Sequence, residues 1–312
     1  MKQVVHSILF LCLTIAALIL GAEWTQRHAV TETSSTVDEA AIKRDLLCLM
    51  MAYPEHIIGV ERQSEDKVFV VMKSGNKILY DDHKMKTFEA KMQNPDLQDM
   101  LEQIYPLDDI SHLMDEDFDP GRIRVYALLK EVYGESKEAV QSNLVNVKIG
   151  YKNYMFNKNN NAAKALQNVM DQLVPLAQKR SDIYSCLFPI NGTFNYRYIA
   201  GTRQLSAHAF GISIDLANDK RDYWKWASRE EGEKRLSVYP REIVQIFEQN
   251  NFIWGGKWGH FDIMHFEYRP EIIIKSKYFS REPLPGRPWH DGVPKDDVVA
   301  NCIWLIESAW QN

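Results

Sequence analysis

The sequence has few cysteines, and none of them are spaced as they would be in a structural metal site. Its four cysteines stand at positions 12, 48, 186 and 302, and no Cys-x-x-Cys motif occurs. Structural zinc sites usually hold their ion through such closely spaced cysteines, so the sequence argues against one. Outside the N-terminal segment, Cys48, Cys186 and Cys302 allow at most one disulfide and one free thiol.

A strong charge imbalance is also absent. The chain has 37 Lys and Arg against 42 Asp and Glu, a net charge of −5, so we expect no nucleic-acid partner. No internal repeat or long low-complexity tract is present. With 312 residues, of which 45% are hydrophobic, the chain is long enough for one large domain or two modest ones. The oligomeric state stays open.

The N-terminus carries the pattern of an export signal. Lys2 precedes an apolar run from Ile8 to Leu20, and polar sequence follows Ala22. This pattern predicts a secretory signal peptide at residues 1–22, and therefore a periplasmic or cell-envelope protein. Leu20 stands where a small residue is preferred for cleavage. The segment is therefore either removed or kept as a membrane anchor, although it is short for a span.

Hydrophobic periodicity predicts an α+β fold. In residues 146–312 we expect a small antiparallel sheet flanked by helices, and in residues 23–145 a separate α+β region. Strands are expected near residues 57–60, 67–72, 77–80, 183–190 and 193–199. Helices are expected near residues 38–52, 95–105, 120–134, 162–179 and 240–249, with one more near the C-terminus. Asp119 is expected to cap the third of these helices, with Pro120 at its first position.

The most informative segment spans residues 206–215. Ile212, Ile214 and Leu216 alternate with polar or small residues, which predicts a strand with Asp215 on the face away from the core. His208 lies before the strand. Gly211 lacks a Cβ and allows the backbone to fold back there, which would bring His208 beside Asp215.

A second segment about fifty residues later also alternates apolar residues with residues that could bind a metal. Its alternation predicts a strand that turns His265 and Glu267 to one face, and Asp262 lies in the Gly-rich loop before it. Two imidazoles and one carboxylate leave a metal coordination position open for water, as in catalytic zinc sites. A nearby carboxylate that is not a ligand would accept a proton from that water.

Each residue also has an ordinary structural interpretation. His208 alone would pass for a loop histidine, and Asp262 for a turn residue. Asp215 on an apolar strand is harder to explain, because a buried carboxylate needs a partner. His260 is interpreted as a surface residue or one behind the ligands, since its spacing to His265 fits neither a helical face nor one strand face.

The two motifs together resemble a known family. Ser-x-His-x-x-Gly-x-Ala-x-Asp, then Trp-Gly-Gly-x-Trp, then Asp or Glu-x-x-His is the pattern of the zinc D-alanyl-D-alanine carboxypeptidases of bacterial cell walls, in their VanY-like branch. This branch is related to L,D-endopeptidases. Ser213 replaces the alanine of the pattern, a small-for-small change. The resemblance covers roughly residues 146–290.

The resemblance implies roles for individual residues. His208, Asp215 and His265 would hold one zinc ion, and Asp262 would be the catalytic base. An arginine upstream of the zinc motif would bind the oxyanion or a substrate carboxylate, and we assign this catalytic role to Arg197. Further substrate contacts are expected from Ser206, Arg203 and Trp258. Glu267 is expected to fix the orientation of His265.

The resemblance implies a zinc peptidase that hydrolyses an amide bond in peptidoglycan stem peptides. D-Ala-D-Ala carboxypeptidase and L,D-endopeptidase activity both fit. A non-catalytic, zinc-bearing cell-wall-binding module of the same fold is the main alternative. An amidase that cuts the sugar–peptide link is a weaker one. Residues 23–145 are expected to pack around the catalytic part, the alternative being a module that positions the substrate or binds the wall.

Overall fold

The computed structural model describes most of the sequence that follows the expected signal segment. The described residues are 39–64, 67–281, 284 and 286–311. The signal segment at residues 1–22 lies outside them. In the part of the protein that is described, no helix combines the length and apolar character that a bilayer span requires.

The protein divides into two compact units. The smaller unit takes the described residues up to Arg44 and those between 284 and 291. Within it, Nε of Arg44 donates a hydrogen bond to the carbonyl oxygen of Trp289 at 2.6 Å. The larger unit holds all the other described residues. The three-part division expected from the sequence stays a prediction.

The larger unit begins with a helical segment, residues 45–52, and an antiparallel sheet. Strands β1 (Ile57–Ser64), β2 (Lys67–Met72) and β3 (Lys77–Leu79) pair in that order. These are the three strands expected in this region, and Gly75 at φ 91° makes the expected turn between the last two. The C-terminal helix α11 (Asp297–Gln311) packs against β1.

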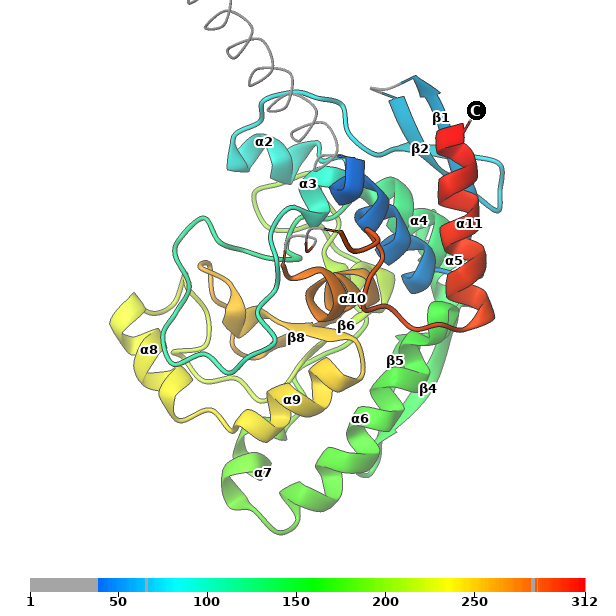
Figure 1. Ribbon diagram of the computed structural model, residues 1–312. Helices are drawn as coiled ribbons and strands as arrows, with labels where there is room; N and C mark the ends of the chain where they lie inside the picture. The colour runs from blue at the N-terminus through cyan, green and yellow to red at the C-terminus, as the bar shows by residue number, and fades with distance from the viewer. Residues whose placement is uncertain (1–38, 65–66, 282–283, 285, 312) are drawn as a thin grey trace, which may run out of the picture. The chain divides into compact units, whose positions relative to one another are not determined.

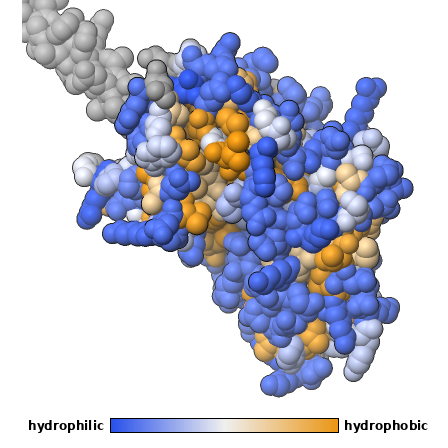
Figure 2. Space-filling model, turned by 90° about the vertical axis from the view of Figure 1, so that its right-hand side faces the viewer, coloured by the Kyte–Doolittle hydropathy of each residue, from blue (hydrophilic) through white to orange (hydrophobic). Residues whose placement is uncertain are grey.

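Short helices lead to a long hairpin. Helices α2 (Phe88–Gln93), α3 (Leu97–Leu101), α4 (Tyr126–Tyr133) and α5 (Lys137–Ser142) precede the strand pair β4 (Leu144–Ile149) and β5 (Lys152–Asn157). Helix α6 (Ala162–Ala177) packs along the hairpin (Figure 1). Its buried residues are mostly alanine, leucine and valine. The face seen in Figure 2 is largely hydrophilic, with hydrophobic residues reaching it in separate patches.

The third sheet is small and antiparallel, with strand order β6-β8-β7. β6 (Ser213–Asp215) and β7 (Phe252–Trp254) flank β8 (His265–Tyr268). Helices α8 (Arg229–Ser237) and α9 (Arg241–Gln249) lie between β6 and β7 in the sequence, and α9 packs against β7. Helix α10 (Pro270–Phe279) follows β8. The expected small antiparallel sheet with flanking helices, and the α+β class, are confirmed.

Two of the expected strands are wrong. Residues Ser181–Leu187 form helix α7, which buries Ile183, Cys186 and Leu187 at helical spacing. A short apolar run is compatible with a buried strand and with one face of a helix, and in the folded protein this segment packs as a helix. Residues 193–199 have no strand ladder. An isolated bridge from Gly192 to Asp215 precedes them, and a second isolated bridge, from Tyr198 to Leu205, lies within them.

The helix expected from Asp119 begins only at Tyr126. Asp119 does not cap a helix, because its buried carboxylate is engaged by Arg122 and His260. Such tertiary partners override a local capping preference. The helix expected to reach residue 105 ends at Leu101. Cys48, Cys186 and Cys302 are all buried, and none of them takes part in a disulfide.

Candidate metal centre and catalytic cleft

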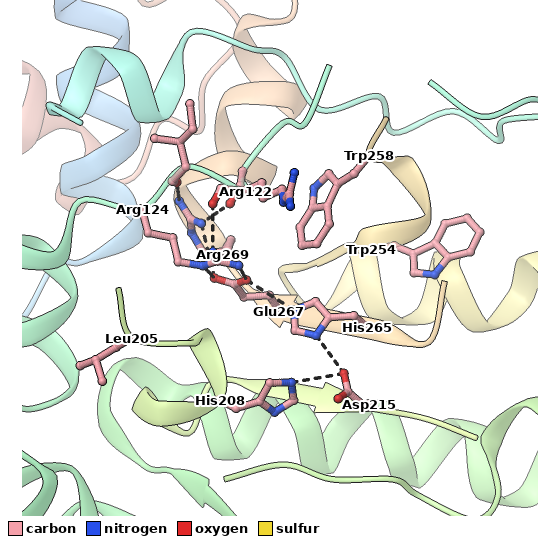
Figure 3. A network of polar contacts seen from close by, with 12 residues as sticks. Arg122, Arg124, Leu205, His208, Asp215, Trp254, Trp258, His265, Glu267 and Arg269 are labelled. Carbon is pink, nitrogen blue, oxygen red and sulfur yellow. Dashed lines mark hydrogen bonds and ion pairs between the residues drawn. The ribbon is translucent and has the colours of Figure 1, made fainter. Parts of the chain in front are cut away.

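The three expected zinc ligands lie together. Oδ1 of Asp215 is 3.2 Å from Nε2 of His208 and 2.9 Å from Nδ1 of His265. One ligand atom from each residue lies within 4.8 Å of the other two (Figure 3). One other set of possible metal ligands in the described residues is equally compact, and it consists of Asp81, Asp82 and Asp96. There, the ammonium group of Lys86 already binds Asp82 at 3.0 Å and Asp96 at 2.7 Å.

Local structure explains how distant residues converge. β6 and β8 pair in a register that places Asp215 directly opposite His265. His208 is carried by the 3-10 turn η2 (Ala207–Phe210), which ends at Gly211 with φ 68°. This left-handed conformation favours glycine, and a Cβ at Gly211 would also come within 2.6 Å of a terminal methyl group of Leu144.

A backbone carbonyl fixes the tautomer of His208. Its Nδ1 lies 2.5 Å from the carbonyl oxygen of Thr193. A carbonyl only accepts, so Nδ1 carries a proton, and in the neutral ring the lone pair lies on Nε2, the atom nearest Asp215. Orientation of a ligand imidazole through its other nitrogen is typical of metal sites.

Asp262 is a partly buried carboxylate, and one of its oxygens is buried and unsatisfied. Its Oδ1 takes no hydrogen bond from any described residue. Burial, opposed by His265 and reinforced by Asp215, raises the pKa of Asp262 to about 7. A buried carboxylate oxygen without a partner is unfavourable, and a carboxyl group that titrates near neutral pH suits a general base.

The glycines of the Trp-Gly-Gly-x-Trp motif give Asp262 its place. A Cβ at Gly255 would lie 2.5 Å from the carbonyl oxygen of Asp262, and one at Gly256 would overlap the Trp254 ring. The amide of Asp262 donates to the carbonyl oxygen of Gly255 at 2.9 Å. The motif therefore lets two backbone segments approach closely.

Lys257 anchors the same loop to its supporting helix. Its ammonium group is almost fully buried and binds Glu248 on α9 and the carbonyl oxygen of Pro106, each at 2.7 Å. Tyr105 donates to the same Glu248 carboxylate at 2.6 Å and accepts from the amide of Trp254 at 3.0 Å. The lysine thus holds the loop against α9.

Glu267 lies behind His265 and holds a buried ion-pair network. Oε2 of Glu267 is 3.6 Å from Nε2 of His265, too long for a hydrogen bond. Arg124 binds both Glu267 oxygens, at 2.8 and 2.5 Å, and Arg269 approaches at 3.4 Å (Figure 3). Burial acts to raise the pKa of Glu267, but the guanidinium of Arg124 outweighs it and holds that pKa well below the usual range. Sequence reasoning missed both arginines, because neither lies in the motifs.

A cleft of about 320 Å³ adjoins the candidate metal centre. Among the expected substrate-contacting residues, Arg197, Ser206 and Trp258 line it. Arg203 is exposed and lies outside the lining, and its role in substrate binding stays a prediction. His260 also lines the cleft and bonds to Asp119, which agrees with its interpretation as a residue other than a ligand. The lining also includes Arg122, Arg124, Tyr223, Trp224, Lys225 and Trp226.

Comparison with known proteins agrees with this site. Residues 200–268 match the model of the D-alanyl-D-alanine carboxypeptidase family, which supports a metallopeptidase of the carboxypeptidase type. The match confirms the resemblance to that family, and its segment contains His208, Asp215, Asp262 and His265. No curated protein and no solved structure matches the sequence.

Metal binding is expected to release a proton from His265. Burial lowers the pKa of His265, but its contacts with Asp215 and Glu267 outweigh this and raise it to about 10. In the metal-free protein at pH 7 the ring is therefore protonated, and a metal must displace that proton. Zinc affinity should rise with pH by roughly tenfold per unit near neutrality. Calorimetry of zinc binding in buffers of different ionisation enthalpy measures the proton release. Binding heats that are the same in every buffer would contradict the prediction.

Proposed function

We propose that the protein is a zinc-dependent peptidase that hydrolyses an amide bond in peptidoglycan stem peptides. The observation that carries this proposal is the compact set of two imidazoles and one carboxylate, beside a second, half-buried carboxylate whose buried oxygen has no partner, in one cleft. This nitrogen and oxygen donor set suits zinc, and it leaves a position open. His208, Asp215 and His265 would hold the ion.

The protein's own groups would perform the proton transfers. Zinc, when bound, lowers the pKa of a coordinated water and polarises a carbonyl group. Oδ1 of Asp262 would take the proton of the attacking water and later deliver it to the leaving amine. Arg197, exposed at the cleft, would bind developing negative charge or a substrate carboxylate. The stem peptide as substrate, and export to the cell envelope, belong to this same proposal.

Digestion of defined muropeptides, followed by mass spectrometry of the products, tests the proposal. We expect cleavage by the zinc-loaded protein, loss of cleavage after complete chelation, and recovery when zinc is restored. The product masses distinguish carboxypeptidase, L,D-endopeptidase and amidase cleavage. Turnover that is unchanged after zinc removal would exclude the mechanism. A protein that binds zinc and wall fragments without cleaving them would be a binding module instead.

A further inference from the structure

A third histidine of the cleft, His260, is held by a buried carboxylate. Nδ1 of His260 lies 2.7 Å from Oδ2 of Asp119, and the backbone amide of His260 donates to Oδ1 of the same residue at 3.0 Å. The Asp119 side chain is fully buried. Its Oδ2 also accepts from Nη1 of Arg122 at 2.7 Å. A carboxylate without exposed surface, 141 positions away in the sequence, therefore orients this imidazole.

Aromatic packing fixes the ring plane of His260. The Phe88 ring stacks on it, with centroids 5.7 Å apart and 5° between the planes. The Trp224 ring meets it edge-on at 4.6 Å. Because Asp119 accepts the Nδ1 proton, Nε2 is the remaining polar atom of the ring, and in the neutral ring it is an acceptor. Within the described part of the protein, Nε2 of His260 makes no hydrogen bond.

His260 lies where two hollows meet. One is the cleft that contains Asp262 and His265. The other, of about 340 Å³, reaches the helix α2 side of the unit and is lined by Phe88, Met92 and Gln93 among others. His260, Arg122 and Trp224 line both hollows. A peptide bound across the metal centre and extending toward α2 would pass this histidine.

We propose that His260 is a substrate-contacting residue whose Nε2 accepts a hydrogen bond from a backbone N–H of an extended peptide, and that Asp119 is its positioning residue. This inference rests on the proposed function and deepens it. The protein would recognise peptide beyond the scissile bond, and so would bind stem peptides better than a dipeptide. A histidine that served packing alone would contribute equally to both ligands.

Binding of uncleaved peptide tests this inference. The full-length Asp262→Asn variant is loaded with zinc, and calorimetry measures its affinity for a stem pentapeptide and for D-Ala-D-Ala. Adding His260→Phe keeps an aromatic ring and removes the acceptor. Loss of one hydrogen bond should weaken pentapeptide binding about tenfold and leave dipeptide binding unchanged. Adding His260→Gln, whose amide oxygen can replace the acceptor, should restore part of the affinity.

If the His260 variants fail to fold, a spectroscopic measurement on the protein with native His260 tests the same inference. In ¹⁵N spectra of the otherwise native protein, neutral His260 should carry its proton on Nδ1, and Asp119→Asn should shift that population toward Nε2. Equal losses for the two ligands with His260→Phe, or an unchanged tautomer with Asp119→Asn, would overturn the inference. Because the assay measures binding, absence of cleavage in the native protein would count against the proposed function only.

Discussion

Asp262→Asn is expected to lower kcat on muropeptides by about 10²–10⁴-fold while the protein still binds zinc. Asparagine has nearly the same shape but cannot take a proton from water. His208, Asp215 and His265 remain in place. Steady-state kinetics and metal analysis of the same preparation measure the two effects. Near-native turnover would show that another group is the base.

The same substitution should not harm the fold. Burial raises the pKa of Asp262, so an ionised carboxylate with an unpartnered oxygen destabilises the native state. A neutral amide removes that cost, and the variant should unfold at the same temperature or higher. Asp171→Asn, at an exposed site on α6, is the matched control and should keep full activity. His208→Ala should lose both zinc and activity.

Arg269→Met is expected to destabilise the larger unit by about 3–5 kcal/mol, because it removes one partner from a buried ion-pair network. Nε of Arg269 donates to Oε1 of Glu271 at 2.5 Å, and its other nitrogens reach the carbonyl oxygens of Gly121 and Ile123. None of its side chain is exposed. Methionine would fill much of the volume but would leave these acceptors unpaired.

Urea unfolding followed by tryptophan fluorescence measures this loss of stability. Arg180→Met is the control, since Arg180 makes its ion pairs with Asp182 and Glu242 on the exposed surface. Surface pairs contribute little, so the control should hardly move the unfolding midpoint. If Arg269→Met and Arg180→Met shift the midpoint equally, the buried network does not stabilise the fold as we infer.

The sequence was most informative where spacing alone decides geometry. The alternation around Asp215 and His265 predicted two strands that turn polar side chains to one face, and the register of β6 and β8 places these two residues opposite each other. The turn at Gly211 and the loop position of Asp262 were also predictable. In each case, a short local pattern restricts the backbone.

Other features depend on contacts between distant segments. Asp119 reads as a helix cap, yet its carboxylate binds His260. Ile183 lies in an apolar run that fits a strand, and packing makes it helical. Arg124 has no local pattern at all and is explained only by Glu267, 143 positions later. The local sequence pattern does not determine which distant side chain a residue contacts in the folded protein.

The ion pair between Arg124 and Glu267 has a practical consequence for protein engineering. The segment that matches the family, residues 200–268, includes Glu267 but neither Arg124 nor Asp119. In a fragment with those boundaries, the buried Glu267 carboxylate on β8 would lack its arginine partner. His260 would lack the Asp119 carboxylate that orients it. Recombinant truncations should therefore start upstream of Asp119. If the motif is transferred to another protein, an arginine that pairs with the equivalent of Glu267 should be transferred as well.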